Sequence, residues 1–235
     1  FPPAAALGIS AVLSTVYPGL PTVPVAIAVV AASTLIALLQ IRVNAWITGL
    51  FLAGEVLALL VVTVLGWSDV VRPFAVLLTA PVMPEGSAMV PASAAGIGLA
   101  TSIAIFALNG YGAAVYFGEE MKEPSRLIAR AILASLVLTL LFEIVPTIAV
   151  LMGAPDLHAL TTASDPFGLI ARLRGNGWVA DATAIGVVIA IVNAIIACIL
   201  ACSRFFYGTA RDGSWGRPID LWMTRIHPRF GSPWV

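Results

Sequence analysis

Two carboxylates of this chain lie inside long apolar runs. Glu55 lies in the middle of the run 46–66, and Glu143 lies in the run 131–151, three residues before Pro146. A charged carboxylate at the centre of a bilayer costs on the order of 2.5–3.5 kcal/mol, so such groups face the protein interior and often carry protons. We interpret Glu55 as a candidate ion-coupling group, with a hydrogen bond to a neighbouring helix as the alternative. Glu143 is a weaker case, because Pro146 frees a carbonyl at a bend.

The segment Asn109-Gly110-Tyr111-Gly112 interrupts the apolar run 96–117. Glycine raises the entropic cost of helix formation and asparagine competes for backbone hydrogen bonds, so this segment favours an unwound turn. Unwound backbone at membrane depth is tolerated only where it faces protein or a water-filled cavity. Membrane transporters bind cargo with carbonyls that are freed in this way. The alternative is close helix packing through small residues.

The other polar side chains in apolar sequence indicate packing rather than chemistry. Asn193 is the strongly polar residue in the middle of the run 180–207, where a hydrogen bond to another helix is typical. Cys198 and Cys202 are four residues apart on the same helix and resemble small core residues. Both histidines fall in loops, and no nucleophile–base order, metal-ligand spacing or phosphate loop is present. We therefore expect no catalytic residue, no metal and no cofactor.

These side chains stand in a chain of 235 residues, of which 60% are apolar and 10% charged. A soluble domain carries about 25% charged residues. Twelve basic and twelve acidic residues give a formal net charge of +0, without the basic excess that a nucleic-acid partner needs. The composition excludes a soluble enzyme and a disordered chain, and it predicts a polytopic protein of the lipid bilayer.

Six apolar stretches approach the length needed to cross a hydrocarbon core about 30 Å thick, which takes roughly 20 helical residues. Each backbone amide in lipid must find its partner within the segment, so these stretches are predicted to be helices. The expected fold is an all-α polytopic transmembrane helical bundle, in one domain over residues 1–235. The predicted helices cover about 4–17, 24–41, 46–66, 96–117 with a break near 109–112, 131–151 and 180–207.

The basic residues predict how the bundle is oriented. If the stretches cross alternately, nine of the twelve Lys and Arg residues fall on one face and three on the other. Basic residues concentrate on the cytoplasmic face, so the C-terminal loop is expected in the cytoplasm, and the loops at 67–95 and 152–179 outside. The nine are Arg42, Lys122, Arg126, Arg130, Arg204, Arg211, Arg217, Arg225 and Arg229; the three are Arg72, Arg172 and Arg174.

The outer loop at 152–179 contains a predicted amphipathic helix. Asp165 is a candidate N-cap and Pro166 suits the first turn, and apolar residues then alternate with Arg172 and Arg174. The helix either lies on the membrane surface or acts as a lid over a pathway.

Two stretches resemble signatures of the amino acid–polyamine–organocation transporters. In that family a broken sixth helix with a Gly-aromatic pair precedes Glu-Glu, Lys-x-Pro, a basic residue and an Ala-Ile start to helix seven. The first stretch runs from Phe106 to Ile132 and contains Gly110-Tyr111, Glu119-Glu120, Lys122-Glu123-Pro124, Arg130 and Ala131-Ile132. The second resembles the end of helix eight and the loop after it, with Ser203-Arg204, Arg211-Asp212-Gly213 and His227-Pro228-Arg229.

This resemblance covers nearly the whole chain and implies the five-plus-five inverted-repeat (LeuT-like) fold, with substrate held between broken helices one and six. The chain would correspond to helices three (in part) to eight of about twelve. It begins at Phe1 rather than at an initiator Met, so we expect an internal fragment of a longer protein that lacks helix one.

The resemblance also implies roles for single residues. The candidate substrate-binding residues are Phe106, Ala107, Asn109, Gly110, Tyr111 and Asn193. Carbonyls near the first three would receive a substrate amino group, and Phe106 would form an aromatic gate. Gly112 departs from the family, in which Glu is common after the Gly-aromatic pair. Glu55 falls about where some proton-coupled relatives carry Lys, so the sign of the charge is reversed.

We therefore predict a secondary active transporter that moves an amino acid or related amine by alternating access, coupled to a proton or another ion. A membrane channel or a non-transporting scaffold is the alternative, if residues 109–112 are a packing motif. An intramembrane enzyme would need a nucleophile–base pair at membrane depth, which the sequence does not offer. The expected location is the plasma membrane, as a multi-pass protein.

Overall fold

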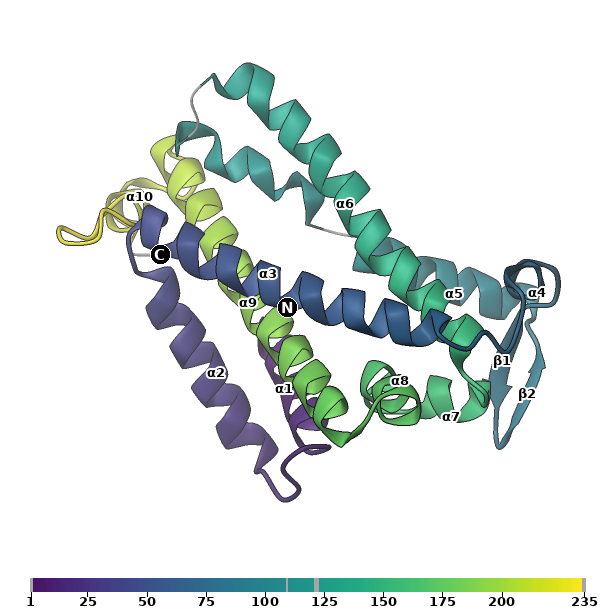
Figure 1. The fold of residues 1–235 in the computed structure, drawn as a ribbon. Coiled ribbons are helices and arrows are strands. Elements are labelled where there is room, and N and C mark those ends of the chain that lie inside the picture. Colours follow the sequence, from purple (N-terminus) through teal and green to yellow (C-terminus); the bar gives the residue numbers. More distant parts are fainter. Residues whose placement is uncertain (1, 109, 121–122, 234–235) are drawn as a thin grey trace. The chain divides into compact units, whose positions relative to one another are not determined.

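The computed structural model describes residues 2–108, 110–120 and 123–233, with the backbone alone at 106, 119 and 120. The chain is predominantly helical (Figure 1), which confirms the all-α prediction. The elements are α1 (Pro2–Leu13), α2 (Thr22–Ala37), α3 (Ile41–Trp67), α4 (Phe74–Thr79), β1 (Val82–Glu85), β2 (Ala88–Pro91), α5 (Ala94–Ala107), η1 (Tyr111–Glu120), α6 (Pro124–Gly153), α7 (Leu157–Thr162), α8 (Pro166–Arg174), α9 (Gly177–Arg211) and α10 (Arg217–Met223).

Three of these helices, α3, α6 and α9, are long and apolar enough to cross a membrane, with 27, 30 and 35 residues. The helices α1, α2 and α5 are apolar but shorter, with 12, 16 and 14 residues. A helix rises about 1.5 Å per residue, so α9 is longer than the roughly 30 Å hydrocarbon core. It is therefore long enough to extend beyond a single crossing.

The loop between α3 and α5 holds structure that the sequence analysis did not predict. The strands β1 and β2 form an antiparallel hairpin, with Val82 opposite Pro91 and Glu85 opposite Ala88. Gly86, with φ of 59°, supplies the left-handed conformation that the turn requires. The short helix α4 precedes the hairpin (Figure 1).

The chain divides into two compact units. The first comprises Phe1–Glu55, Ala113–Ala131 and Val187–Val235, and the second Val56–Gly112 and Ile132–Gly186. Each unit has its own apolar core, described in turn below.

In the first unit, α1 and α2 form a helical hairpin. Ile9 of α1, Ala26 of α2 and Ile195 of α9 share a buried cluster, and the hydroxyl of Ser10 donates to the carbonyl of Thr22 at 3.1 Å. The small residues Ala26 and Ser10 let the helix backbones approach closely, which is how helices associate in lipid. The hairpin is thereby packed on α9.

A second cluster of the first unit holds α2, α3, η1 and α9 together. Ala37, Ile196 and Leu200 are buried in it, and Phe51 of α3 and Phe117 of η1 pack against them. The link from α2 to α3 is closed by Asn44, which is 1% exposed and donates from Nδ2 to the carbonyl of Leu39 at 2.8 Å. This amide satisfies backbone that the end of α2 leaves without a partner.

In the second unit, α3 and α6 cross with their backbones in contact. A methyl group on Gly66 would lie 2.5 Å from the carbonyl oxygen of Ala149, and one on Gly153 would overlap the carbonyl of Gly66. Only glycine allows this approach. α6 runs through Pro146 without interruption, and Pro146 itself is buried. The exposed Glu143 lies on another part of the same helix.

Two arginines satisfy the last carbonyls of α6. Nη1 of Arg72 donates to the carbonyls of Leu151 and Ala154, the latter at 2.7 Å. Arg174 of α8 donates to the carbonyl of Gly153 at 2.9 Å and pairs with the carboxylate of Asp69. A helix C-terminus leaves four carbonyls unbonded and attracts positive charge. Arg72 and Arg174 are thus structural caps.

The amphipathic helix predicted in the loop 152–179 is α8, and its cap is confirmed. The carboxylate of Asp165 accepts from the amide of Gly168 at 2.9 Å, and Pro166 occupies the first turn. Ile170 is fully buried in a cluster with Leu160 of α7, Val62 of α3 and residues of α6. The apolar face of α8 therefore packs on protein within this unit.

Candidate functional site

The predicted 96–117 helix is built as two helices. α5 ends at Ala107, and η1 begins at Tyr111. Between them Gly110 has φ of 111°, a conformation that residues with a side chain rarely adopt. The last carbonyls of a helix have no partner within it, so the end of α5 presents main-chain acceptors at this point.

The segment after the break is wound more tightly than an α-helix. η1 is a 3₁₀-helix of ten residues. Runs of this type longer than three or four residues are uncommon, and inside a helix they often mark a functional hinge or strain. The break therefore changes the backbone over the whole of Tyr111–Glu120 and not at one residue alone.

The side chains near the break are accessible within the described structure. Ala107 and Gly110 are exposed, and Tyr111 is 46% exposed. Asn109 and the side chain of Phe106 lie outside the described residues, so the proposed gate at Phe106 stays a prediction.

Glu55 lies on α3 and is half-buried. It follows Phe51 by one helical turn, and Phe51 packs against the cluster that contains Ile196 and Leu200 of α9. Residues four apart in a helix share a face. The carboxylate therefore lies on the face of α3 that is turned toward α9.

Asn193 lies on the corresponding face of α9, one turn before Ile196. Its Oδ1 atom is buried and has no hydrogen-bond partner among the described residues. A buried amide oxygen without a donor is costly. If α3 and α9 cross in opposite directions, as the sequence predicts, Glu55 and Asn193 lie on the same side of the cluster that contains Ile196 and Leu200. The first unit thus holds both side chains on facing helix surfaces.

Ser33 of α2 is a polar residue that the sequence analysis overlooked. It is fully buried, and its hydroxyl has no partner among the described residues. Ser33 shares a helix face with Ala26 and Ala37, which pack on α9. A serine in an apolar helix carries little signal in sequence, because Ser commonly packs between membrane helices.

The two cysteines lie close together on α9. The sulfur atoms of Cys198 and Cys202 are 4.0 Å apart as free thiols. In the described part of the chain, no three His, Cys, Asp or Glu side chains gather as a metal site would require.

An apolar helix that breaks at glycine is typical of transporters. The chain matches the amino acid permease family over residues 4–235. The protein belongs to that family. Amino acid permeases are transporters and not enzymes, and the family implies a polytopic helical LeuT-like fold in the membrane.

Curated relatives agree with this assignment. An uncharacterized transporter of Mycobacterium tuberculosis is 30% identical over 210 residues, which cover 89% of this chain and 44% of the relative. A branched-chain amino acid permease of Bacillus subtilis is 26% identical over 66% of this chain and 31% of its own length. Cationic amino acid transporter 7 of Arabidopsis thaliana, a chloroplastic protein, is 25% identical over 89% of this chain and 35% of its own length. The chain thus spans less than half of these relatives.

Proposed function

We propose that the permease to which this chain belongs moves an amino acid or related amine across the plasma membrane by alternating access, coupled to protons. The six helices predicted from sequence would cross the membrane, with the C-terminal loop in the cytoplasm. Cargo would bind at the break between α5 and η1, and the helices would move around that point.

The observation that carries this proposal is the interruption at Gly110. Its φ of 111° and the 3₁₀ winding of Tyr111–Glu120 remove regular helix from an apolar segment. Backbone carbonyls there are good partners for an ammonium group, because each offers lone pairs without a counter-charge. The carbonyls of Phe106, Ala107 and Asn109 are assigned to the substrate amine, and Tyr111 to its side chain.

Glu55 is the proposed coupling group. It lies half-buried on the face of α3 toward α9, where a proton that binds removes a charge from the apolar interior. Asn193 would line the pathway beside it, with its buried oxygen available to cargo or to the protonated carboxyl. Protonation of Glu55 would therefore alter how α3 and α9 pack.

The names of the relatives support an amino acid as cargo and leave its side chain open. One relative is named for branched-chain and another for cationic amino acids. The groups that these substrates share are the α-ammonium and the α-carboxylate. The break supplies acceptors for the first of these, which is why we assign recognition of the amine to it.

The test is uptake of labelled amino acids by the full-length permease in liposomes. Uptake should saturate with substrate, accumulate against a gradient when the outside is acidified, and stop when the proton gradient is collapsed. A flux that rises linearly with substrate and ignores the gradient would mean a channel. Absence of any flux in a folded preparation would favour a scaffold without transport.

A further inference from the structure

The short helix α10 exposes most of its large apolar side chains. Leu221 is 62% exposed and Trp222 is 54% exposed, whereas Met223 is buried. Residues four apart share a helix face, so Leu221 lies beside Arg217, which is also exposed. We call Arg217, Leu221 and Trp222 the outer face of α10. A helix in contact with water normally turns its apolar residues toward the protein, so this outer face indicates apolar surroundings.

Contacts with α9 hold α10 in this orientation. The indole nitrogen Nε1 of Trp215, in the turn before α10, donates to the hydroxyl of Thr209 at 2.9 Å. The ring of Trp215 meets the ring of Phe206 with centroids 5.9 Å apart. The carboxylate of Asp220, a half-buried residue, accepts from the backbone amide of Trp215 at 3.1 Å. The acidic residue of α10 is thereby used within the protein, while Arg217 stays on the outer face.

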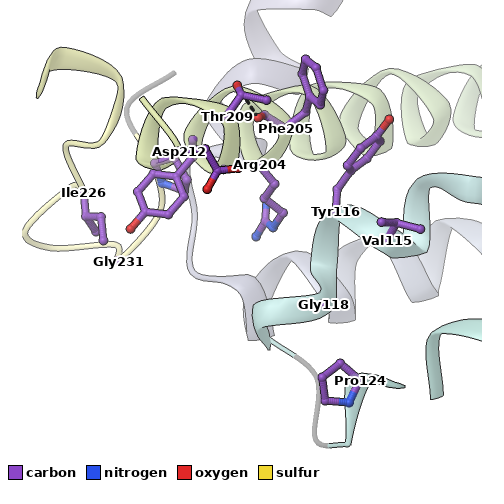
Figure 2. Close-up of a pocket in the computed structure, with 13 residues that line it drawn as sticks. Val115, Tyr116, Gly118, Pro124, Arg204, Phe205, Thr209, Asp212, Ile226 and Gly231 are labelled. Carbon is purple, nitrogen blue, oxygen red and sulfur yellow. Dashed lines mark hydrogen bonds between the residues drawn. The ribbon is translucent and has the colours of Figure 1, made fainter. Parts of the chain in front are cut away.

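The segment after α10 adds positive charge at exposed positions. Arg225 and Arg229 are exposed, and Ile226 beside Arg225 is 51% exposed. Figure 2 shows Ile226 and Gly231 on this segment, which lines a cavity of about 710 Å³ together with the last turns of α9. Residues 211–233 contain four arginines and two aspartates. The part of the chain that follows α9 is therefore cationic.

The start of α3 shows the same pairing of arginine with tryptophan. Arg42 is exposed, and Trp46, four residues later on the same helix face, is 82% exposed. The hydroxyl of Ser232, in the segment after α10, donates to the carbonyl of Leu38 in the link between α2 and α3, at 3.0 Å. This bond ties the segment after α10 to the link that precedes Arg42. Both arginine–tryptophan pairs therefore lie at the same end of the first unit (Figure 1).

The sequence predicts that this end of the unit lies at the cytoplasmic headgroups. The predicted membrane segment 180–207 would rise about 42 Å as a helix, close to the roughly 40–45 Å of a bilayer with its headgroups. α9 ends at Arg211, shortly after this segment, and α10 begins at Arg217. Tryptophan concentrates at this level of a membrane, and the cytoplasmic leaflet carries anionic lipids.

We propose that the outer face of α10 and the Arg42–Trp46 pair of α3 form one surface that binds anionic lipid headgroups of the cytoplasmic leaflet. The side chains of Leu221, Trp222 and Trp46 enter the boundary between headgroups and acyl chains. The guanidinium groups of Arg217 and Arg42 bind lipid phosphates, whose oxygens match their planar fork of donors. The inference goes beyond transport and takes only the orientation of the chain from the proposed function.

A segment of the full-length permease beyond this chain is the other candidate to cover the surface, because the chain spans less than half of its relatives. The charges favour lipid. A protein segment packed on Leu221 and Trp46 would also bury the neighbouring arginines, Arg217 and Arg42, and a buried charge needs its own partner. At the surface of a bilayer the same guanidinium groups reach both phosphate and water.

The test places a nitroxide spin label at Leu221→Cys in the full-length permease, in a background without other cysteines. The permease is reconstituted in bilayers of phosphatidylcholine, with or without phosphatidylglycerol. Electron paramagnetic resonance measures collisions of the label with oxygen, which concentrates in lipid, and with a water-soluble nickel complex. In bilayers with phosphatidylglycerol, the label should collide mainly with oxygen. Added salt should shift the collisions toward the nickel complex, because salt screens the arginines.

Arg217→Gln should also shift the collisions toward the nickel complex in bilayers with phosphatidylglycerol. The ratio of inserted to released label should fall about fivefold, which is the effect of one arginine near an anionic membrane surface. Arg126→Gln is the matched control. It removes an exposed arginine of α6 on the same predicted side of the membrane but outside the proposed surface, so the label should behave as it does without the substitution.

Three results would overturn the proposal. Collisions mainly with the nickel complex in every bilayer would put the outer face of α10 in water. Protection from both reagents would show that another segment of the permease covers this face. Equal collisions with oxygen in both kinds of bilayer, unchanged by Arg217→Gln, would remove anionic lipid from the contact. Failure of the proposed function looks different, because amino acid would then not be taken up while the label still entered anionic bilayers.

Discussion

Glu55 and Asn193 are polar side chains on the helix faces where α3 and α9 meet. The oxygen of Asn193 is buried without a described donor, and Glu55 is half-buried one turn from Phe51. Apolar side chains at these two positions would pack between the helices without the free-energy cost of burying polar groups. The cost of placing Glu55 and Asn193 there supports the proposed roles of Glu55 in ion coupling and of Asn193 in substrate binding, and each role can be tested alone.

Replacing Glu55 by Gln should remove the pH dependence of uptake. An amide of the same shape binds no proton, so uptake by Glu55→Gln should stay flat as the external pH falls, whereas wild-type uptake should rise. Binding of the amino acid should persist. Glu143→Gln is the matched control, because Glu143 is exposed on α6 and its substitution should keep the wild-type pH profile. A wild-type profile in Glu55→Gln would remove Glu55 from the coupling step.

Replacing Asn193 by Ala tests whether its buried oxygen binds cargo. Loss of a hydrogen bond to the ammonium group should raise the dissociation constant about tenfold. Ser33→Ala, which also removes a buried and unpartnered polar atom on a face toward α9, serves as the comparison and should leave affinity unchanged. Equal affinity in Asn193→Ala and wild type, measured by equilibrium binding, would assign Asn193 to helix packing.

At the scale of elements, the sequence best predicts the helices and breaks that depend on residues adjacent in the chain. The long apolar runs predict α3, α6 and α9, the Asp165-Pro166 pair predicts the start of α8, and the Asn-Gly pair predicts an interruption near Gly110. These features depend on neighbours in the chain, such as an N-cap bonding three residues ahead.

The features that sequence did not predict depend on partners far away in the chain. The carbonyls at the end of α6 are capped by Arg72 and Arg174, which lie in two different loops. The charge of these residues predicted which face of the membrane they occupy, but not that they bind backbone. The β1–β2 hairpin was missed as well, because its strands of four residues are too short for a clear alternating pattern.

The contact of α3 with α6 predicts a size limit at Gly153. A methyl group there would overlap the carbonyl of Gly66, and overpacking of this kind costs about 1–3 kcal/mol. Gly153→Ala should therefore lower the midpoint of thermal unfolding of the full-length permease in detergent. Gly54→Ala is the control on α3, where an added methyl group meets nothing within 4 Å, and should leave the midpoint unchanged. Equal midpoints for the two variants would contradict the close crossing.

At the scale of the whole molecule, the proposed orientation assigns the β1–β2 hairpin to the outside and the segment after α9 to the cytoplasm. Single cysteines at Ser87 and Ser214, both exposed, would test this in a background in which Cys198 and Cys202 are replaced by Ala. An impermeant thiol reagent should label Ser87→Cys on intact cells, and Ser214→Cys only after permeabilisation. The opposite pattern would invert the proposed orientation.

The central proposal is that main-chain groups released at Gly110 bind the cargo. Equilibrium binding of labelled amino acid to purified full-length Gly110→Ala tests it most directly, because a methyl group at a φ of 111° is strained and drives this segment toward regular helix. Gly98→Ala in α5, where an added methyl group meets nothing within 4 Å, is the control. The account predicts that Gly98→Ala binds as wild type and that folded Gly110→Ala loses binding at least tenfold. Wild-type affinity in Gly110→Ala would contradict it.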